Sequence, residues 1–182
     1  MSEANEPARN ERRASDDAPA GGTISGTALR ARVLVVSTGV AAGTREDRGG
    51  PALVELLAGA GYEVDEPVVV ADGLDRVAEA LRSLTVGFAG LVATTGGTGF
   101  SPSDVTPEAT LAVVERHAPG LAEAMRGVDP RGRLGRGVCG TVGRALVVNC
   151  PGSPGGAVDQ LSAILDVLPH ALRLLADAPT AH

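Results

Sequence analysis

Short aliphatic runs alternate with segments of helical periodicity along most of the chain. Four such runs predict strands, at residues 31–37, 64–70, 89–94 and 145–149. The first, ARVLVVS, is almost continuously apolar, which is typical of a strand buried on both faces of a parallel sheet. The segments between the runs place apolar residues three and four positions apart, as in helices that lie with one face on a sheet.

Proline, glycine and hydroxyl residues mark the predicted helix ends. Pro51 and Gly61 fit the first position of a helix and the position after its end. Thr106 and Ser153 each precede a proline, so each can cap a helix. Pro169 should kink or divide the last helix. The predicted helices span residues 51–60, 74–84, 107–117 and 154–175.

The alternation of strands and helices predicts a three-layer α/β/α fold with a mainly parallel sheet. Ligands bind beyond the carboxyl ends of the strands in such sheets, so the loops at those ends are the ones of interest. We expect residues 30–178 to form a single domain of this kind. Residues 1–29 have mixed charge, many Gly, Pro and Ala residues and no aromatic residue. Such a segment buries too little apolar surface to offset its ordering entropy, so we expect a disordered tail.

Composition limits the chemistry that the domain can perform. All 16 basic residues are Arg, and the lack of Lys excludes both a Walker A phosphate loop and a pyridoxal-phosphate Schiff base. The net charge of -6 argues against general nucleic-acid binding. Cys139 and Cys150 have no CxxC spacing and form no zinc pattern with the three scattered His residues. This use of cysteine predicts a reduced, cytoplasmic protein, and no apolar segment reaches the roughly 18 residues of a membrane helix.

A glycine-rich loop follows the third predicted strand, with the sequence TTGGTGFSPSDVTPEAT. Its three closely spaced glycines allow the backbone to approach a ligand and to turn several N–H groups toward one point. The helix that starts after the loop favours negative charge at its amino end. The loop therefore suits a phosphate or pyrophosphate group. Spacing alone leaves open that the glycines serve only chain reversal.

Two acids follow predicted strands. Asp104 lies inside the glycine-rich loop, where an acid has no obvious place unless a cation or a proton-transfer step needs it. The alternative is a helix-start role, but Thr106 fills the cap position better. Asp72 follows the second strand and either serves the ligand site or caps the next helix. Together the two carboxylates could hold Mg²⁺ or act as a general base.

Two further loops lie at the same predicted edge of the sheet. Gly152 and Ser153 belong to a second Gly/Ser turn that leads into a helix, which makes a second candidate anion site or a plain helix cap. Asp47 lies between the first strand and the first helix. It either contributes to ligand binding or pairs with Arg45 or Arg48.

These loops together resemble those of the MoaB/Mog family, the molybdopterin adenylyltransferases and their relatives. The resemblance covers roughly residues 31–176 in order, and the long TGGTG motif is highly specific. Gly49 and Gly135 stand where the family commonly has Ser. The matching segments are residues 47–51 (DRGGP), 95–99 (TGGTG), 104–110 (DVTPEAT), 135–140 (GRGVCG) and 149–154 (NCPGSP).

The resemblance implies a reaction and a site. The terminal phosphate of molybdopterin would attack the α-phosphate of the co-substrate ATP with Mg²⁺ as cofactor, releasing pyrophosphate and leaving adenylylated molybdopterin. The family's two catalytic aspartates match Asp72 and Asp104, which would also hold the Mg²⁺. The resemblance further implies a homotrimer and a possible hand-off to a molybdenum-insertion protein. The predicted substrate-binding residues are Thr95, Gly96, Gly97, Thr98, Gly99, Asp47, Gly152 and Ser153.

Three other functions compete with adenylyl transfer. A non-catalytic pterin-binding or scaffolding paralogue would bind the pterin without ATP turnover. A generic nucleotide-binding α/β domain would bind nucleotide with no preference for molybdopterin. A CinA-like relative would share the TGGTG loop but act on a different nucleotide, and substrate competition would distinguish it.

Overall fold

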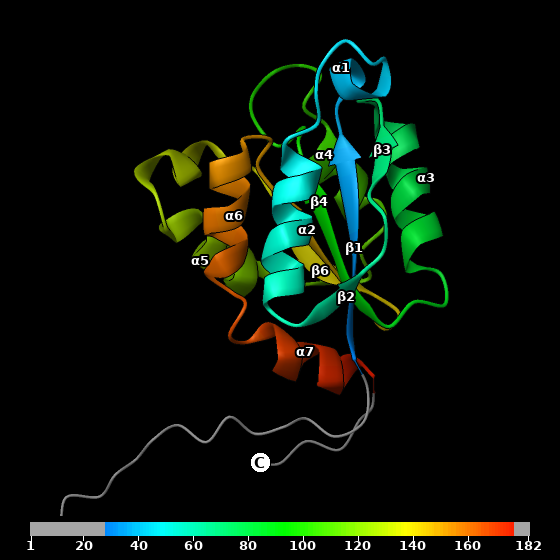
Figure 1. Ribbon diagram of the computed structural model, residues 1–182, viewed down its shortest axis with the longest axis vertical. Coiled ribbons are helices and arrows are strands. Elements are labelled where there is room, and N and C mark those ends of the chain that lie inside the picture. Colours follow the sequence, from blue (N-terminus) through cyan, green and yellow to red (C-terminus); the bar gives the residue numbers. More distant parts are fainter. Residues whose placement is uncertain (1–27, 177–182) are drawn as a thin grey trace, which may run out of the picture.

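The computed structural model describes residues 28–176 (Figure 1). Its centre is a seven-stranded sheet with the order β2-β1-β4-β7-β6-β5, and β3 also pairs with β1. Of the predicted tail, residues 1–27 lie outside the described residues, and the predicted bound at residue 29 is wrong, because Leu29 already belongs to a strand. The strands are β1 (Leu29–Val36), β2 (Tyr62–Val64), β3 (Val68–Val70), β4 (Gly90–Thr95), β5 (Arg116–His117), β6 (Cys139–Val142) and β7 (Ala145–Cys150).

Helices cover both faces of this sheet. They are α1 (Thr38–Ala41), α2 (Gly49–Gly59), α3 (Leu74–Thr85), α4 (Thr106–Leu111), α5 (Pro119–Gly127), α6 (Pro154–Ser162) and α7 (Leu168–Leu175), with a 3-10 helix, η1 (Pro130–Leu134). Figure 1 shows α2 and α6 on one side of β1 and α3 on the other. None of the helices in residues 28–176 is long and apolar enough to cross a membrane.

Alternating residues of β1 supply two separate cores. Val33 and Val35 pack with residues of α2 and α6, whereas Leu34 and Val36 pack with residues of α3 and α4. Successive side chains of a strand point to opposite faces, so a continuously apolar strand serves both layers. The predicted three-layer α/β/α fold and its aliphatic core are confirmed.

The sheet is mainly parallel, as predicted. β1 pairs in parallel with β2, β3 and β4, and β4 pairs in parallel with β7. The edge made of β6 and β5 is antiparallel and was not predicted. Each of its strands has only two to four residues, too few for a clear periodic signal.

The single strand predicted at 64–70 is wrong in detail. It is two short strands, and both pair with β1. Val64 lies opposite Ala31 and Val68 lies opposite Leu34, so the outer chain has one more residue than β1 between these pairs. Pro67 lies in this interruption, where the lack of an N–H donor is tolerated.

The helix predicted at 107–117 is also wrong, because α4 ends at Leu111. The chain then turns and pairs with β6: Glu115 N donates to Thr141 O, and Ala118 N donates to Cys139 O. Pairing with the sheet therefore overrides the local helical preference. The last predicted helix is divided as expected, since α6 ends at Ser162 and the next helix begins beside Pro169.

Candidate functional site

A cleft of about 1190 Å³ lies at the carboxyl ends of the parallel strands, the upper edge in Figure 1, where β1 points toward α1. The structure brings all ten predicted site residues to its lining. They are Asp47, Asp72, Thr95, Gly96, Gly97, Thr98, Gly99, Asp104, Gly152 and Ser153. Loops from four places in the sequence therefore meet at one site.

The floor of the cleft is the glycine-rich turn after β4. Gly96 and Gly97 have φ values of 102° and 64°, in the region that favours glycine. A Cβ on Gly96 would overlap Val36 O, and one on Gly97 would overlap Thr106 Oγ1. The turn thus requires glycine for its own shape. At Gly96 and Gly97 the glycines therefore serve chain reversal, the alternative that spacing alone left open.

Thr106 holds this turn in place. Its Oγ1 donates to Gly96 O at 2.9 Å, and its backbone N donates to Gly97 O at 3.0 Å. The prediction that Thr106 caps the helix is wrong: Val105 is the N-cap, and Thr106 is the first residue of α4. The Thr106 hydroxyl is committed to the glycine-rich turn instead.

The turn leaves donors without partners. In the described part of the chain, the amides of Gly97, Thr98 and Gly99 donate no hydrogen bond to protein. Successive N–H groups in such a conformation form an anion-binding concavity. This is the feature of the cleft that best fits a phosphate group.

A second glycine-rich turn packs on the first. Thr95 Oγ1 donates to Pro151 O at 2.8 Å, and Gly152 lies against Gly96 so closely that a Cβ would be 3.3 Å from the Gly96 Cα. Ser153 is the N-cap of α6, as predicted, but its side chain makes no capping hydrogen bond. The exposed Ser153 hydroxyl thus remains available to a ligand at the amino end of a nine-residue helix.

A buried polar network fixes the two central strands above this floor. Asn149 Nδ2 donates to Thr94 Oγ1 and Thr110 Oγ1 at 3.1 and 3.0 Å, and its Oδ1 accepts from Val138 N at 3.1 Å. Asn149 therefore ties β7 to β4, to α4 and to the segment that enters β6. Sequence reasoning did not identify this role.

Asp72 is bonded to the start of α1. Its Oδ2 accepts from Thr38 N at 2.8 Å and from Thr38 Oγ1 at 2.7 Å. The alternative that Asp72 caps the next helix is wrong, because Gly73 is the N-cap of α3 and makes no side-chain cap. The other oxygen, Oδ1, accepts no hydrogen bond from residues 28–176 and is available at the cleft.

As in Asp72, only one of the two carboxylate oxygens of Asp104 accepts hydrogen bonds from the protein. Its Oδ2 accepts from Ser101 N at 2.9 Å, and its own N donates to Ser101 O at 2.9 Å. The carboxylate therefore closes the loop before α4 rather than capping the helix. Its Oδ1 has no hydrogen-bond donor within the described residues.

Asp47 serves the first turn of α2. Its Oδ1 accepts from Gly49 N and Gly50 N, both at 3.0 Å. The suggested pairing with Arg45 or Arg48 is wrong: within residues 28–176 Asp47 makes no ion pair, and Arg48 pairs with Glu46 at 3.1 Å. The Asp47 side chain lines the cleft, but one of its two carboxylate oxygens already accepts hydrogen bonds from the start of α2.

The cleft carries more acids than bases. Its acidic lining residues are Glu46, Asp47, Asp72, Asp104, Asp129 and Asp159, and its basic ones are Arg45, Arg48 and Arg131. An anionic ligand would be repelled by these carboxylates unless a cation accompanied it. Residues 28–176 contain no group of three His, Cys, Asp or Glu side chains that could hold a metal ion. A cation at this cleft would therefore need ligands from a substrate or from water in addition to the available oxygens of Asp72 and Asp104.

The outer wall of the cleft comes from a segment that is not among the predicted site residues. Val128, Asp129, Arg131 and Leu134 line this side, on and beside η1. Asp129 caps η1 by accepting from Arg131 N at 2.7 Å, and its hydrogen bonds with Arg131 lower its pKa. The segment has no periodic signal, so its place in the fold depends on tertiary contacts alone.

The two cysteines take no part in the cleft. Burial raises the pKa of Cys139 to about 12 and raises the pKa of Cys150 as well. A thiol that remains protonated at neutral pH is a poor nucleophile. Neither cysteine is therefore a candidate nucleophile at the cleft.

Comparison with known proteins agrees with this geometry. The sequence model of a family described as a probable molybdopterin binding domain matches residues 32–170. The chain belongs to this family. The segments that surround the cleft, from the end of β1 to the start of α6, all lie within the matched range.

Relatives of similar size within the molybdopterin-binding domain family give further detail. The molybdopterin adenylyltransferase of Escherichia coli K12 is 34% identical over 151 residues, which are 76% of this chain and 74% of that protein. The structure of MoaB from Thermus thermophilus matches with a TM-score of 0.77 and 43% identity, over 83% of this chain and 98% of that one. Mog from Mycobacterium ulcerans matches with a TM-score of 0.76 and 43% identity, over 84% and 99%. The MogA/MoaB-like α/β fold is thereby confirmed.

Some members of the family are much longer. The chain is 33% identical over 153 residues to the molybdenum cofactor synthesis protein cinnamon of Drosophila melanogaster, covering 80% of this chain. It spans about a quarter of the length of cinnamon and of Dictyostelium discoideum gephyrin (25% and 22%). A CinA protein from Thermoplasma acidophilum, at 22% identity and a TM-score of 0.60, shares the fold alone.

Proposed function

We propose that this chain is a molybdopterin adenylyltransferase of molybdenum cofactor biosynthesis. The observation that supports this most directly is the group of three unpartnered amides at Gly97, Thr98 and Gly99, which lies in one cleft with Asp72 and Asp104. Its relatives of similar size include proteins named for this activity. The cleft combines anion-binding backbone with acids that suit a cation, as transfer between two phosphate-bearing substrates requires.

The proposed reaction is a displacement at phosphorus. An oxygen of the molybdopterin phosphate forms a bond to the α-phosphorus of ATP, and the bond from that phosphorus to the bridging oxygen of the leaving pyrophosphate breaks. AMP is thereby attached to molybdopterin, and pyrophosphate leaves with the bonding electrons. Such reactions depend mainly on positioning and on stabilising negative charge.

Each part of the cleft has a role in this proposal. The amides of Gly97, Thr98 and Gly99 bind phosphate oxygens, and the Ser153 hydroxyl binds a second anionic group at the amino end of α6. Asp72 and Asp104 would hold Mg²⁺ through their available oxygens, and the cation would neutralise charge on the reacting phosphates. Thr95, Gly96, Gly152 and Asp47 shape the binding surface around them.

Assembly, location and transfer of the product are separate proposals. We infer a homotrimer in the cytoplasm that passes its product to a molybdenum-insertion protein, on the resemblance to the family. Light scattering at micromolar concentration tests the assembly, and a monomer mass would contradict it.

The decisive experiment is turnover by the purified protein. Molybdopterin and ATP are added with and without Mg²⁺, and adenylylated product and pyrophosphate are measured. The proposal expects both products in equal amounts, with Mg²⁺ required. Tight pterin binding without product would support a non-catalytic pterin-binding protein instead. Nucleotide binding with no preference for molybdopterin would support a generic nucleotide-binding domain.

A further inference from the structure

Arg136 lies outside the cleft lining but contacts the loop that carries Asp104. It belongs to the segment between η1 and β6. Its backbone N donates to Thr98 O at 3.0 Å, and its Nε donates to Gly99 O at 2.7 Å. One terminal guanidinium nitrogen donates to Asp104 O at 2.5 Å. The side chain therefore spans both ends of the loop from Gly99 to Asp104.

The second terminal nitrogen of Arg136 pairs with the Glu108 carboxylate on α4. This hydrogen bond lowers the pKa of Glu108, which remains charged at neutral pH. The guanidinium also lies 6.0 Å from the ring centre of Phe100, a side chain that is 70% exposed at the loop. Arg136 itself is 29% exposed, so its contacts are partly shielded from water.

No other long-range hydrogen bond holds this loop within the described residues. The remaining hydrogen bonds of residues 99–104 join Ser101 to Ser103 or Asp104, inside the loop itself. Local bonds give the loop a shape, but they do not fix its place over the cleft. The contacts of Arg136 do so, because they connect the loop to a segment more than thirty residues away.

We propose that Arg136 is a positioning residue that holds the Gly99–Asp104 loop, and with it the Asp104 carboxylate, at the cleft. Arginine suits this task because its planar fork presents donors on three nitrogens in fixed directions. Here the three nitrogens face Gly99 O, Asp104 O and the Glu108 carboxylate. A lysine ammonium, with its donors on one atom, cannot meet three separated acceptors in the same way.

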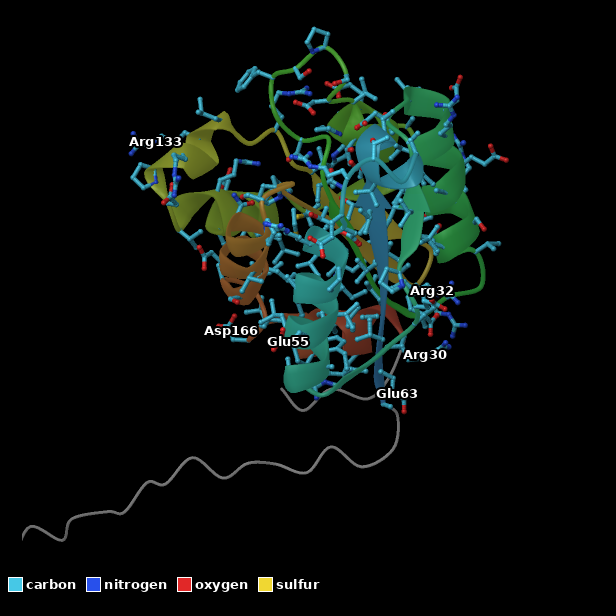
Figure 2. All side chains as sticks on the ribbon, turned by 45° about the horizontal axis from the view of Figure 1, so that its top comes forward. Arg30, Arg32, Glu55, Glu63, Arg133 and Asp166 are labelled. Atoms are coloured by element: carbon cyan, nitrogen blue, oxygen red, sulfur yellow. The ribbon has the colours of Figure 1, made fainter. Side chains whose placement is uncertain are left out.

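The test compares Arg136→Gln, Arg136→Lys and a matched control, Arg133→Gln. Arg133 is three residues away and exposed, does not line the cleft, and lies at the outer edge of the fold in Figure 2. Hydrogen exchange of the amides of residues 99–105 is measured in ligand-free protein. We expect about tenfold faster exchange in Arg136→Gln, an intermediate effect in Arg136→Lys and no change in Arg133→Gln, as the loss of charged hydrogen bonds would give.

Turnover and melting temperature are measured on the same variants, and this arm rests on the proposed function. We expect kcat to fall about tenfold or more in Arg136→Gln, with the KM for ATP changing less and the melting temperature close to that of the control. Unchanged loop exchange in Arg136→Gln would overturn the proposal, and so would a loosened loop with unchanged kcat. If Arg136→Gln does not fold, wild-type exchange and kcat in Arg136→Lys would overturn it. An inactive wild type would refute the proposed function, and the exchange arm would still test the hold of Arg136 on the loop.

Discussion

Replacing Asp72 separates the catalytic and structural roles of one carboxylate. Its Oδ2 accepts two hydrogen bonds from Thr38, and its Oδ1 has no hydrogen-bond partner within residues 28–176. In Asp72→Asn the amide oxygen can occupy the Oδ2 position and keep both bonds. The new NH₂ group then takes the place of Oδ1. The variant thus loses negative charge at the cleft and little of the structure.

The expected magnitudes follow from these contacts. A hydrogen bond to a charged group contributes about 1 kcal/mol more than a neutral one, and water screens this partly exposed pair, so Asp72→Asn should cost about 1 kcal/mol or less. Asp72→Ala loses both bonds to Thr38 and should cost about 1–2 kcal/mol, the range for a lost helix cap. That cost lowers the melting temperature by roughly 2–8 °C in a domain of this size. Turnover should fall about 10²-fold or more in both variants, because both lose the charge at the reacting phosphates.

The assay is adenylyl transfer at saturating substrate, with a thermal melt of each variant. Asp166→Asn is the control, since Asp166 is exposed and lies far from α1 in Figure 2. We expect the two Asp72 variants to lose turnover equally, whereas Asp72→Ala should lose more stability than Asp72→Asn. Turnover of Asp72→Asn within about threefold of wild type would refute the catalytic assignment, since an electrostatic role should be worth far more.

Four further predictions concern buried polar side chains and the two buried thiols. Asn149→Leu should destabilise the fold by about 2–5 kcal/mol, measured by urea denaturation, because it leaves more than one buried polar group without its partner. Thr106→Val keeps the shape of the side chain but removes the donor to Gly96 O; a cost of about 1–3 kcal/mol and weaker ligand binding by calorimetry are expected, and an unchanged melt would count against this account of the turn. The thiols of Cys139 and Cys150 should react with a thiol reagent only after unfolding. Folding raises the pKa of Cys139 from 9.0 to about 12, so the contribution of its protonated thiol to stability is present below pH 9 and is lost as pH rises toward 12. Denaturation at pH 8 and at pH 10 should therefore give a lower free energy of unfolding at pH 10.

The layers of the fold could be predicted because its central strands have one simple pattern. β1, β4 and β7 are buried on both faces, and the helices that cover them carry clear apolar stripes. The short antiparallel edge could not be predicted in the same way. Arg116 and His117 in β5 are exposed and polar, and only the hydrogen bonds to β6 make them a strand. Such residues carry no period that a sequence pattern can detect.

The cleft residues were predictable for a related reason. Glycines, acids and hydroxyl residues directly after apolar runs indicate which loops lie at the carboxyl edge. The partners of these side chains were not predictable. Asp72 bonds with Thr38, 34 residues away, and Thr106 bonds with Gly96 rather than with its own helix. Those contacts depend on how loops from different crossovers pack, which no local pattern encodes.

The antiparallel edge determines which parts of the cleft can change during evolution. The floor of the cleft consists of the turns that come directly after β4 and β7, so the pairing of these two parallel strands fixes its position. The outer-wall residues Val128, Asp129, Arg131 and Leu134 precede β6 in the sequence. Because β6 is antiparallel to β7, the first residue of β6 lies at the same edge of the sheet as the last residues of β7. Residues inserted before β6 would reshape this wall without shifting any parallel strand pair. A chain of this kind can therefore acquire a new ligand preference from one side while the phosphate-binding floor stays the same.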